Sequence, residues 1–326
     1  WVIDHIDQDV PMLIEQIRTR VLPKRGIVAA PDEILITLGS QNALYLLTRL
    51  LLSSTTRIGV ENPCFREAIN TFLLADAEVV PHPVDEEGIV LNERPCDYYY
   101  VTPGHQVPTG VTMSSARRRQ LLEHAARHDA VIIEDDYDSE SNFTLNPLPA
   151  LKASDRSGRV VYVSSLSKAL SPGLRLGFMV ADPDLIDEAR ALRRLVYRHP
   201  PTNIQYQMAH FLAQGHYETH LRRYHYDSAQ RWERLHAALQ RYLPSCRALA
   251  GSEHANAFWL QTPAQINTQQ LTWRAAHAGV LIEPGARHFL NAAPPDNYFR
   301  MGFHAINPDA IAQGVEVLRG QLEQMG

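Results

Sequence analysis

Three features that would mark a membrane, nucleic-acid-binding or disulfide-rich protein are missing from this chain of 326 residues. No apolar run approaches the roughly 18 residues that span a bilayer. The longest candidate, residues 43–52, is interrupted by Tyr45, Thr48 and Arg49. The formal net charge of −5 argues against a broad nucleic-acid surface. We therefore expect neither a membrane span nor direct DNA binding by these residues.

Cysteine is scarce as well. Cys64, Cys96 and Cys246 are scattered along the chain, and no two of them form a CxxC pair. A sparse, odd set is typical of a reducing cytoplasm rather than of a disulfide framework, so we predict a cytoplasmic protein. The chain begins with Trp1 rather than Met, so we interpret it as a fragment, a processed chain or the ordered part of a longer protein.

Short β-branched runs alternate with longer helical patterns through the first two-thirds of the chain. Helices are expected at residues 41–52, 65–74 and 115–128. The predicted strands lie at residues 34–38, 57–61, 78–81, 98–102, 130–134, 160–164 and 176–180. Several are apolar throughout, as strands covered on both faces are. This alternation predicts an α/β fold with a mostly parallel seven-stranded sheet, in which ligands bind at the carboxyl ends of the strands.

The pattern changes beyond about Asp184, where long helical segments continue as far as Leu243. Short strands are then expected at residues 258–261, 280–283 and 299–303, with a helix between them and one at the end. The length of the chain also fits a large domain plus a smaller one. We predict a large domain over residues 1–228 and a small C-terminal α+β domain over residues 229–326.

Polar residues follow the first predicted strand, where residues 39–42 read Gly-Ser-Gln-Asn and open a helix. A small turn at a helix N-terminus offers free N–H groups and the positive end of the helix dipole to a phosphate. An ordinary helix N-cap is the alternative.

Acidic residues end another predicted strand, where residues 134–138 read Glu-Asp-Asp-Tyr-Asp. Burying carboxylates is costly unless they are paired. One carboxylate that faces a ring nitrogen would keep that nitrogen protonated. The alternatives are a divalent-metal site, weakened by the lack of a Walker-type glycine loop or an HExxH motif, and a run of caps and turns.

A third strand ends in hydroxyl groups, followed by Lys168 and, seven residues later, by Arg175. Hydroxyls and a guanidinium suit a phosphate dianion. A lysine whose amine is partly deprotonated by burial and by cationic neighbours can form a Schiff base. The alternative is a surface lysine in a serine-rich loop.

Arg300 lies within an otherwise apolar predicted strand of the small domain, at residues 298–303. An arginine in such a place needs an anionic partner. That partner is either the carboxylate of a bound ligand or an internal acid.

Taken together, these segments resemble the fold-type I proteins that bind pyridoxal 5′-phosphate (PLP). Three strings are more specific: His-Gln-x-Pro-Thr-Gly at 105–110, Ile-Glu-Asp-Asp-Tyr-Asp-Ser-Glu at 133–140, and Ser-Leu-Ser-Lys-x-Leu-x-Pro-Gly-Leu-Arg-Leu-Gly at 165–177. They are similar to the effector domains of MocR/GabR-type transcription regulators. The resemblance covers nearly the whole chain.

The resemblance implies a PLP cofactor held as an imine by Lys168. Asp135 would pair with the pyridinium nitrogen, and Tyr137 would hydrogen-bond the 3-oxygen of the ring. Phe65 stands where the family usually stacks a tyrosine on the ring, and His105 would lie near the ring face. The phosphate would be held by Ser40, Gln41, Ser165, Ser167 and Arg175.

The ligand implied by the resemblance is amino-acid-like, with its carboxylate gripped by Arg300. Two positions depart from the family pattern. Val107 replaces the asparagine that typical aminotransferases carry before Pro-Thr-Gly, so one ring contact is missing or replaced. Glu67 occupies the position of a second arginine that some of these regulators use for a longer amino acid. An acid there would suit a ligand with an extra amino group, such as a diamino acid.

Two functions remain open at this stage. In the first, the chain is the sensing domain of a regulator whose DNA-binding winged helix-turn-helix precedes Trp1. An amino-acid effector would displace Lys168 to form an external aldimine and favour one of two conformations. In the second, the chain is a free-standing aminotransferase in which Lys168 also moves a proton. The motif subtype favours the sensor, and the resemblance implies a homodimer.

Overall fold

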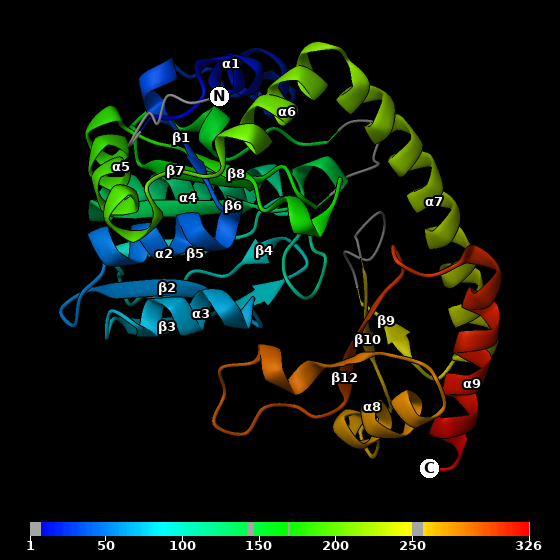
Figure 1. Cartoon of the computed structure of the whole chain (residues 1–326). Helices are drawn as coiled ribbons and strands as arrows, with labels where there is room; N and C mark the ends of the chain where they lie inside the picture. The colour runs from blue at the N-terminus through cyan, green and yellow to red at the C-terminus, as the bar shows by residue number, and fades with distance from the viewer. Residues whose placement is uncertain (1–7, 142–146, 169, 250–256, 326) are drawn as a thin grey trace.

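The computed structural model describes residues 8–141, 147–168, 170–249 and 257–325. Figure 1 shows a large lobe built around a sheet and a smaller lobe that carries the C-terminus. The long helix α7 (His216–Tyr242) runs along one side of the molecule and joins the two lobes.

The large lobe is built on an eight-stranded sheet in the order β1-β8-β7-β6-β5-β2-β3-β4. Its strands are β1 (Ile34–Thr37), β2 (Arg57–Asn62), β3 (Glu78–Asp85), β4 (Gly88–Ile89), β5 (Tyr98–Val101), β6 (Val131–Asp136), β7 (Val160–Ser165) and β8 (Gly177–Val180). Neighbouring strands from β3 through β7 pair in parallel, whereas β8 runs antiparallel to both β7 and β1. The predicted α/β fold is thus confirmed, and the two-residue β4 adds an eighth strand in a hairpin with β3.

Helices cover both faces of this sheet, because alternate residues of each strand point to opposite sides. Those of the large lobe are α1 (Pro11–Gln16), α2 (Ser40–Leu51), α3 (Arg66–Leu73), α4 (Ser115–His128), α5 (Pro183–Tyr197) and α6 (Thr202–Ala213). Leu35 of β1 packs in a core with α2, α3 and α5, whereas Ile34 and Ile36 pack in another with α1 and α6. Burial on both faces explains the apolar runs that predicted these strands.

Local sequence signals fix the ends of the helices. The Ser114 hydroxyl accepts a hydrogen bond from the Arg117 N–H at the start of α4, and Asp129 adopts a left-handed conformation (φ 56°) directly after its end. The Asp182 carboxylate caps α5, whose first residue is Pro183. Because these residues fix where α4 and α5 begin or end, they also limit where the neighbouring strands can begin or end in the sequence.

The small lobe combines a four-stranded antiparallel sheet with two helices. The strands are β9 (Arg247–Ala248), β10 (Ala257–Gln261), β11 (Glu283–Pro284) and β12 (Tyr298–Gly302), in the order β11-β12-β10-β9, and the helices are α8 (Thr268–His277) and α9 (Ile311–Glu323). The strand expected at residues 280–283 is reduced to Glu283–Pro284. Val280 instead bonds back to the Ala275 carbonyl at the end of α8, and Pro284 has no N–H to extend the pairing.

The predicted domain boundary between residues 228 and 229 falls inside α7. Leu221 belongs to a core of the large lobe, and Leu235 belongs to the core of the small lobe. The boundary itself stays a prediction, because one continuous helix serves both lobes.

The structure also bears on the expectations about disulfides and membrane spans, for the residues that it describes. Cys64, Cys96 and Cys246 are all free thiols. Among the described residues, no helix combines the length and the apolar character that crossing a bilayer would require.

Candidate functional site

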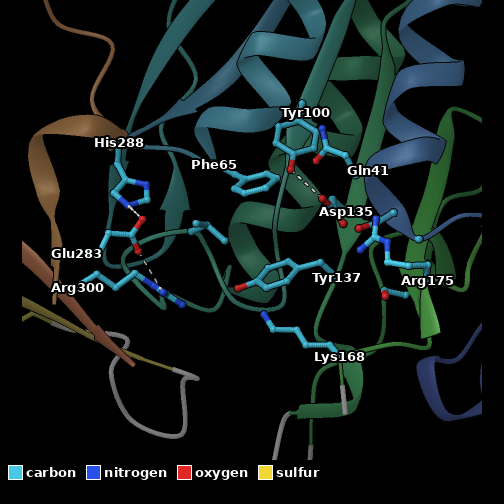
Figure 2. Close-up of a pocket in the computed structure, with 14 residues that line it drawn as sticks. Gln41, Phe65, Tyr100, Asp135, Tyr137, Lys168, Arg175, Glu283, His288 and Arg300 are labelled. Carbon is cyan, nitrogen blue, oxygen red and sulfur yellow. Dashed lines mark hydrogen bonds and ion pairs between the residues drawn. The ribbon is translucent and has the colours of Figure 1, made fainter. Parts of the chain in front are cut away.

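A cavity of about 340 Å³ lies between the carboxyl ends of the parallel strands and the small lobe. Figure 2 shows side chains from both lobes converging on it. Nine residues predicted from the sequence line this cavity: Ser40, Gln41, Phe65, Asp135, Tyr137, Ser165, Lys168, Arg175 and Arg300. Segments separated by up to 260 positions in the sequence are therefore brought together at one site.

One end of the cavity is built to receive an anion. The N-terminus of α2 begins at Ser40, directly after Gly39, whose φ of 79° suits a residue without a side chain. A Cβ atom at Gly39 would lie 3.2 Å from a guanidinium nitrogen of Arg175. Arg175 donates to the Leu38 carbonyl at 3.2 Å, which leaves its other N–H groups for a ligand. Together with Ser165, these groups fit a phosphate.

A buried carboxylate lies deeper in the cavity, at the end of β6. Asp135 Oδ2 accepts a hydrogen bond from the Tyr100 hydroxyl at 2.8 Å (Figure 2), whereas Oδ1 is buried and has no hydrogen-bond partner among the described residues. Burial raises the pKa of Asp135 to about 7. A protonated ring nitrogen beside Oδ1 would satisfy this oxygen and favour the ionised carboxylate.

The amine of Lys168 projects into the cavity from the segment after β7. Its Nζ lies 3.9 Å from the centre of the Tyr137 ring and 4.0 Å from Asp138 Oδ2. Burial lowers the pKa of Lys168, although 37% of its side chain remains accessible where it borders the cavity. Burial also raises the pKa of Tyr137 well above its usual range, so the phenol stays protonated and can donate. A partly desolvated amine of this kind is suited to nucleophilic attack.

Arg300 reaches the cavity from the small lobe and is not free there. Its Nη1 lies 3.4 Å from Glu283 Oε2, and Glu283 Oε1 lies 3.4 Å from His288 Nε2 (Figure 2). The His288 side chain, whose Nε2 faces Glu283 Oε1, is the main cause that lowers the pKa of Glu283 to about 2. Glu283 and Arg300 are directly opposite each other on β11 and β12. An internal acid thus pairs with the arginine that was predicted to bind a ligand carboxylate.

Three residues that were expected at the site do not line the cavity. The Ser167 hydroxyl accepts from the Leu176 N–H at 2.8 Å and donates to the Leu176 carbonyl, so it closes the loop between Lys168 and Arg175. His105 is buried, with Nδ1 3.1 Å from Asp138 Oδ2. Glu67 lies in the first turn of α3, in a separate surface depression that Arg287 also borders.

The acidic segment at the end of β6 divides its carboxylates among different partners. Glu134 accepts from the Leu151 and Lys152 N–H groups, and Asp136 pairs with Arg25 at 2.7 Å on a side away from Asp135. Across the parts of the chain that the structure describes, no three His, Cys, Asp or Glu side chains are grouped to hold a metal ion. The divalent-metal alternative for this segment therefore lacks a site among these residues.

Three cavity residues were missed by sequence reasoning. Tyr100 holds Asp135, and Glu283 and His288 border Arg300. The run Tyr98-Tyr99-Tyr100 predicted a strand, yet nothing in it identifies which tyrosine faces the site. Glu283 could be found only from the register of β11 against β12.

The fold and the cavity define a class of protein. The family model for aminotransferase class I and II matches residues 7–316, and the chain belongs to this family.

Among curated proteins, the chain is 39% identical over 316 residues to the HTH-type transcriptional regulator TauR of Rhodobacter capsulatus, covering 96% of this chain and 65% of that protein. It is 33% identical to the probable rhizopine catabolism regulatory protein MocR of Rhizobium meliloti, covering 98% of this chain and 64% of that protein. The chain thus spans slightly less than two-thirds of these relatives. The predicted likeness to MocR-type regulators is confirmed.

Solved structures of aminotransferases share the fold. The kynurenine aminotransferase of Pyrococcus horikoshii has a TM-score of 0.91 at 27% identity and covers 99% of this chain and 82% of that one. LysN, the α-aminoadipate aminotransferase of Thermus thermophilus, has a TM-score of 0.88 at 28% identity, with 97% and 82% covered, and was solved with N-(5′-phosphopyridoxyl)-L-leucine. The family and these relatives imply pyridoxal phosphate as the cofactor. Asp135 Oδ1, which has no hydrogen-bond partner among the described residues, and the anion-binding end of the cavity fit that group.

Proposed function

We propose that this chain is the PLP-binding, effector-sensing domain of a MocR-type transcription regulator and that it takes an amino-acid-like ligand. The observation that carries the proposal is the position of Lys168. Its partly desolvated amine lies in one cavity with Arg300 of the other lobe and with Asp135 Oδ1, which no described residue hydrogen-bonds. The similarity of almost the whole chain to two transcription regulators supports a sensing role.

Several cavity residues would hold the cofactor under this proposal. Asp135 would pair with the ring nitrogen, and Tyr137 would donate to the ring oxygen. Phe65, directly before α3, would pack against the ring. Ser40, Gln41, Ser165 and Arg175 would hold the phosphate at the N-terminus of α2. Ser167 acts indirectly, by closing the loop that carries Lys168 and Arg175.

The chemistry at the centre of the cavity concerns amines. When bound, pyridoxal phosphate supplies an aldehyde carbon that reacts with the amine of Lys168 or with that of an amino acid. Burial lowers the pKa of Lys168, which increases the share of neutral amine able to react. Asp135 and Tyr137 would hold the ring of the bound cofactor in place.

Arg300 recognises the carboxylate of the ligand in this proposal. To do so, it exchanges Glu283 for the ligand, and Glu283 keeps His288 and Arg287 as partners. A diamino acid was suggested by Glu67, but that carboxylate lies outside the cavity. Glu283 is the acid that borders it, so a second amino group on the ligand would meet Glu283.

The setting of the whole protein belongs to the same proposal. DNA is contacted through a winged helix-turn-helix outside this chain, two copies associate as in aminotransferases of this fold, and the protein works in the cytoplasm. The free cysteines are compatible with that compartment.

The test is reconstitution of the purified chain with PLP, followed by borohydride reduction and peptide mapping. We expect visible absorbance and a label on Lys168. Lys168→Ala should abolish the label without loss of fold, whereas Lys24→Ala, at an exposed lysine paired with Glu218, should label normally. A label on another lysine, or a folded chain that stays colourless, contradicts the proposal.

A free-standing aminotransferase is the second candidate, and the likeness to solved aminotransferases over nearly the whole chain favours it. Addition of amino acids separates the two functions. A spectral change that stops once the ligand amine has replaced Lys168 supports sensing. Steady release of a keto acid supports the enzyme.

A further inference from the structure

A second buried carboxylate lies next to the reactive lysine, outside the set that holds the cofactor. Asp138 follows Tyr137 in the turn after β6, and its side chain is only 2% exposed. Its Oδ2 lies 4.0 Å from Lys168 Nζ and 3.1 Å from His105 Nδ1. A single oxygen is thus placed between the lysine amine and a buried imidazole.

The charged groups around Lys168 come from several elements. Asp135 and Asp138 approach from the end of β6 and favour the ammonium form, whereas Arg300 of β12 opposes it. His304 follows β12 and also borders this region. Burial lowers the pKa of His304 to about 4, so its imidazole is neutral at neutral pH. Asp138 is the carboxylate within ion-pair distance of Nζ among the described residues.

The geometry points to Asp138 as the counter-ion of the Lys168 amine, with His105 as the residue that positions Asp138. This inference rests on the proposed function, because it gives the lysine that would carry the cofactor a charge partner. Asp138 and His105 are positioning residues, since neither borders the cavity.

The role of His105 follows from what a buried carboxylate needs. A carboxylate taken out of water is costly unless hydrogen bonds satisfy it. An N–H of His105 at Nδ1 donates to Asp138 Oδ2, with the tautomer assigned from this contact. His105 thereby helps to hold Asp138 in the orientation that faces Lys168. The histidine of the His-Gln-x-Pro-Thr-Gly segment therefore acts on Lys168 through Asp138 and does not contact the cofactor ring.

Asp138→Asn tests the inference, because it removes the charge and keeps the size of the side chain. The amine is titrated in the full chain without cofactor, by measuring how fast Lys168 is acetylated across a pH series and quantifying its peptide. A carboxylate at about 4 Å raises the pKa of an amine by roughly 1 unit or more. We therefore expect the midpoint for Asp138→Asn to fall by about 1 pH unit. The PLP-loaded chain gives a second reading through the pH at which its visible absorbance changes, which should fall as well.

Asp85→Asn is the matched control, because it removes an aspartate that pairs with Arg117 rather than with a cavity residue. It should leave both midpoints unchanged. His105→Asn provides a second variant if Asp138→Asn does not fold, and it should move the midpoints in the same direction by less. The inference is overturned if folded variants at both positions titrate like the unmodified chain. The acetylation series does not depend on PLP, so a chain that fails to bind PLP would refute the proposed function and leave this test readable.

Discussion

Replacing Glu283 by glutamine should strengthen the binding of ligands that carry a carboxylate. Glu283 Oε2 lies 3.4 Å from Arg300 Nη1, and the two residues are paired across β11 and β12. A ligand carboxylate has to take Arg300 from this internal acid. Glutamine keeps the size of the side chain and removes its charge, so the competitor becomes weaker.

The magnitude follows from the exposure of the pair. The side chains of Glu283 and Arg300 are 32% and 27% exposed, so solvent screens their attraction. Ion pairs of this kind contribute about 0.2–1 kcal/mol. Since about 1.4 kcal/mol corresponds to a tenfold change in affinity, the dissociation constant should fall by roughly 1.4-fold to 5-fold. The gain should shrink at high salt, because ions screen a partly exposed site.

The assay is a spectral titration of the PLP-loaded chain with a pair of ligands. One ligand is an amino acid with a single amino group, and the other is the amine of the same carbon skeleton without the carboxylate. Only the amino acid should bind more tightly to Glu283→Gln. Glu67→Gln is the matched control, because Glu67 lies outside the cavity on α3 and accepts from Asn70.

Two results would refute this reasoning. If Glu283→Gln binds the amino acid more weakly, Glu283 orients Arg300 for the ligand instead of competing with it. If the amine and the amino acid gain equally, the effect comes from the general potential of the cavity and not from Arg300. An added Arg300→Gln substitution should cancel the gain in the first variant, since the contested guanidinium is then absent.

Two further predictions concern stability and are measured by urea unfolding. Burial raises the pKa of Glu61 from 4.5 to about 7, so ionising this carboxyl lowers the stability of the folded chain as the pH rises from 4.5 to 7. The stability advantage of Glu61→Gln over the unmodified chain should therefore grow by on the order of 2 kcal/mol between pH 5 and pH 8. An advantage of equal size at both pH values would contradict the assignment. Asp9→Ala should lower the free energy of unfolding by about 3–5 kcal/mol. The fully buried Arg193 pairs with Asp9 at 2.6 Å and would lose that counter-ion. A loss below about 1 kcal/mol, typical of exposed pairs, would show that the pair is not buried in solution.

The strands and their polar ends were predictable because a buried strand is a run of apolar residues in the sequence, and polar residues mark where that run ends. Strand β6 is apolar until it meets its acids, and β7 is apolar until it meets its hydroxyls, so the edge where ligands bind is visible in the sequence. The cavity residues Asp135, Ser165 and Lys168 all follow from this rule.

Residues whose role depends on which face they occupy were not predictable in the same way. Tyr99 and Tyr100 are neighbours in β5, and their side chains point to opposite faces. The Tyr99 hydroxyl bonds to His124 of α4, whereas the Tyr100 hydroxyl bonds to Asp135 at the site. Alternation shows that they differ but does not show which one faces the cavity, because that depends on the order of strands in the sheet.

The same limit explains the residues that were expected in the cavity and lie beside it. Among the hydroxyls before Lys168, Ser165 borders the cavity and Ser167 turns to the backbone of Leu176. His105 lies in a segment that approaches the site, yet its ring turns to Asp138. Glu283 could be recognised as a site residue only from its pairing with Arg300, which lies 17 positions away on another strand. Side-chain direction in loops and register between strands are set by tertiary packing.

The position of the two binding groups explains how a ligand could become a signal. Lys168 belongs to the large lobe and Arg300 to the small lobe, and His288 of the small lobe also bonds to the Cys64 carbonyl of the large lobe at 3.0 Å. Under the proposed function, a ligand with an amine at one end and a carboxylate at the other would bridge the lobes and take Arg300 from Glu283. An amine without a carboxylate reaches Lys168 and leaves that pair intact. If the lobes adopt two arrangements, only the bridging ligand would differ in free energy between them, which is the condition for shifting the population.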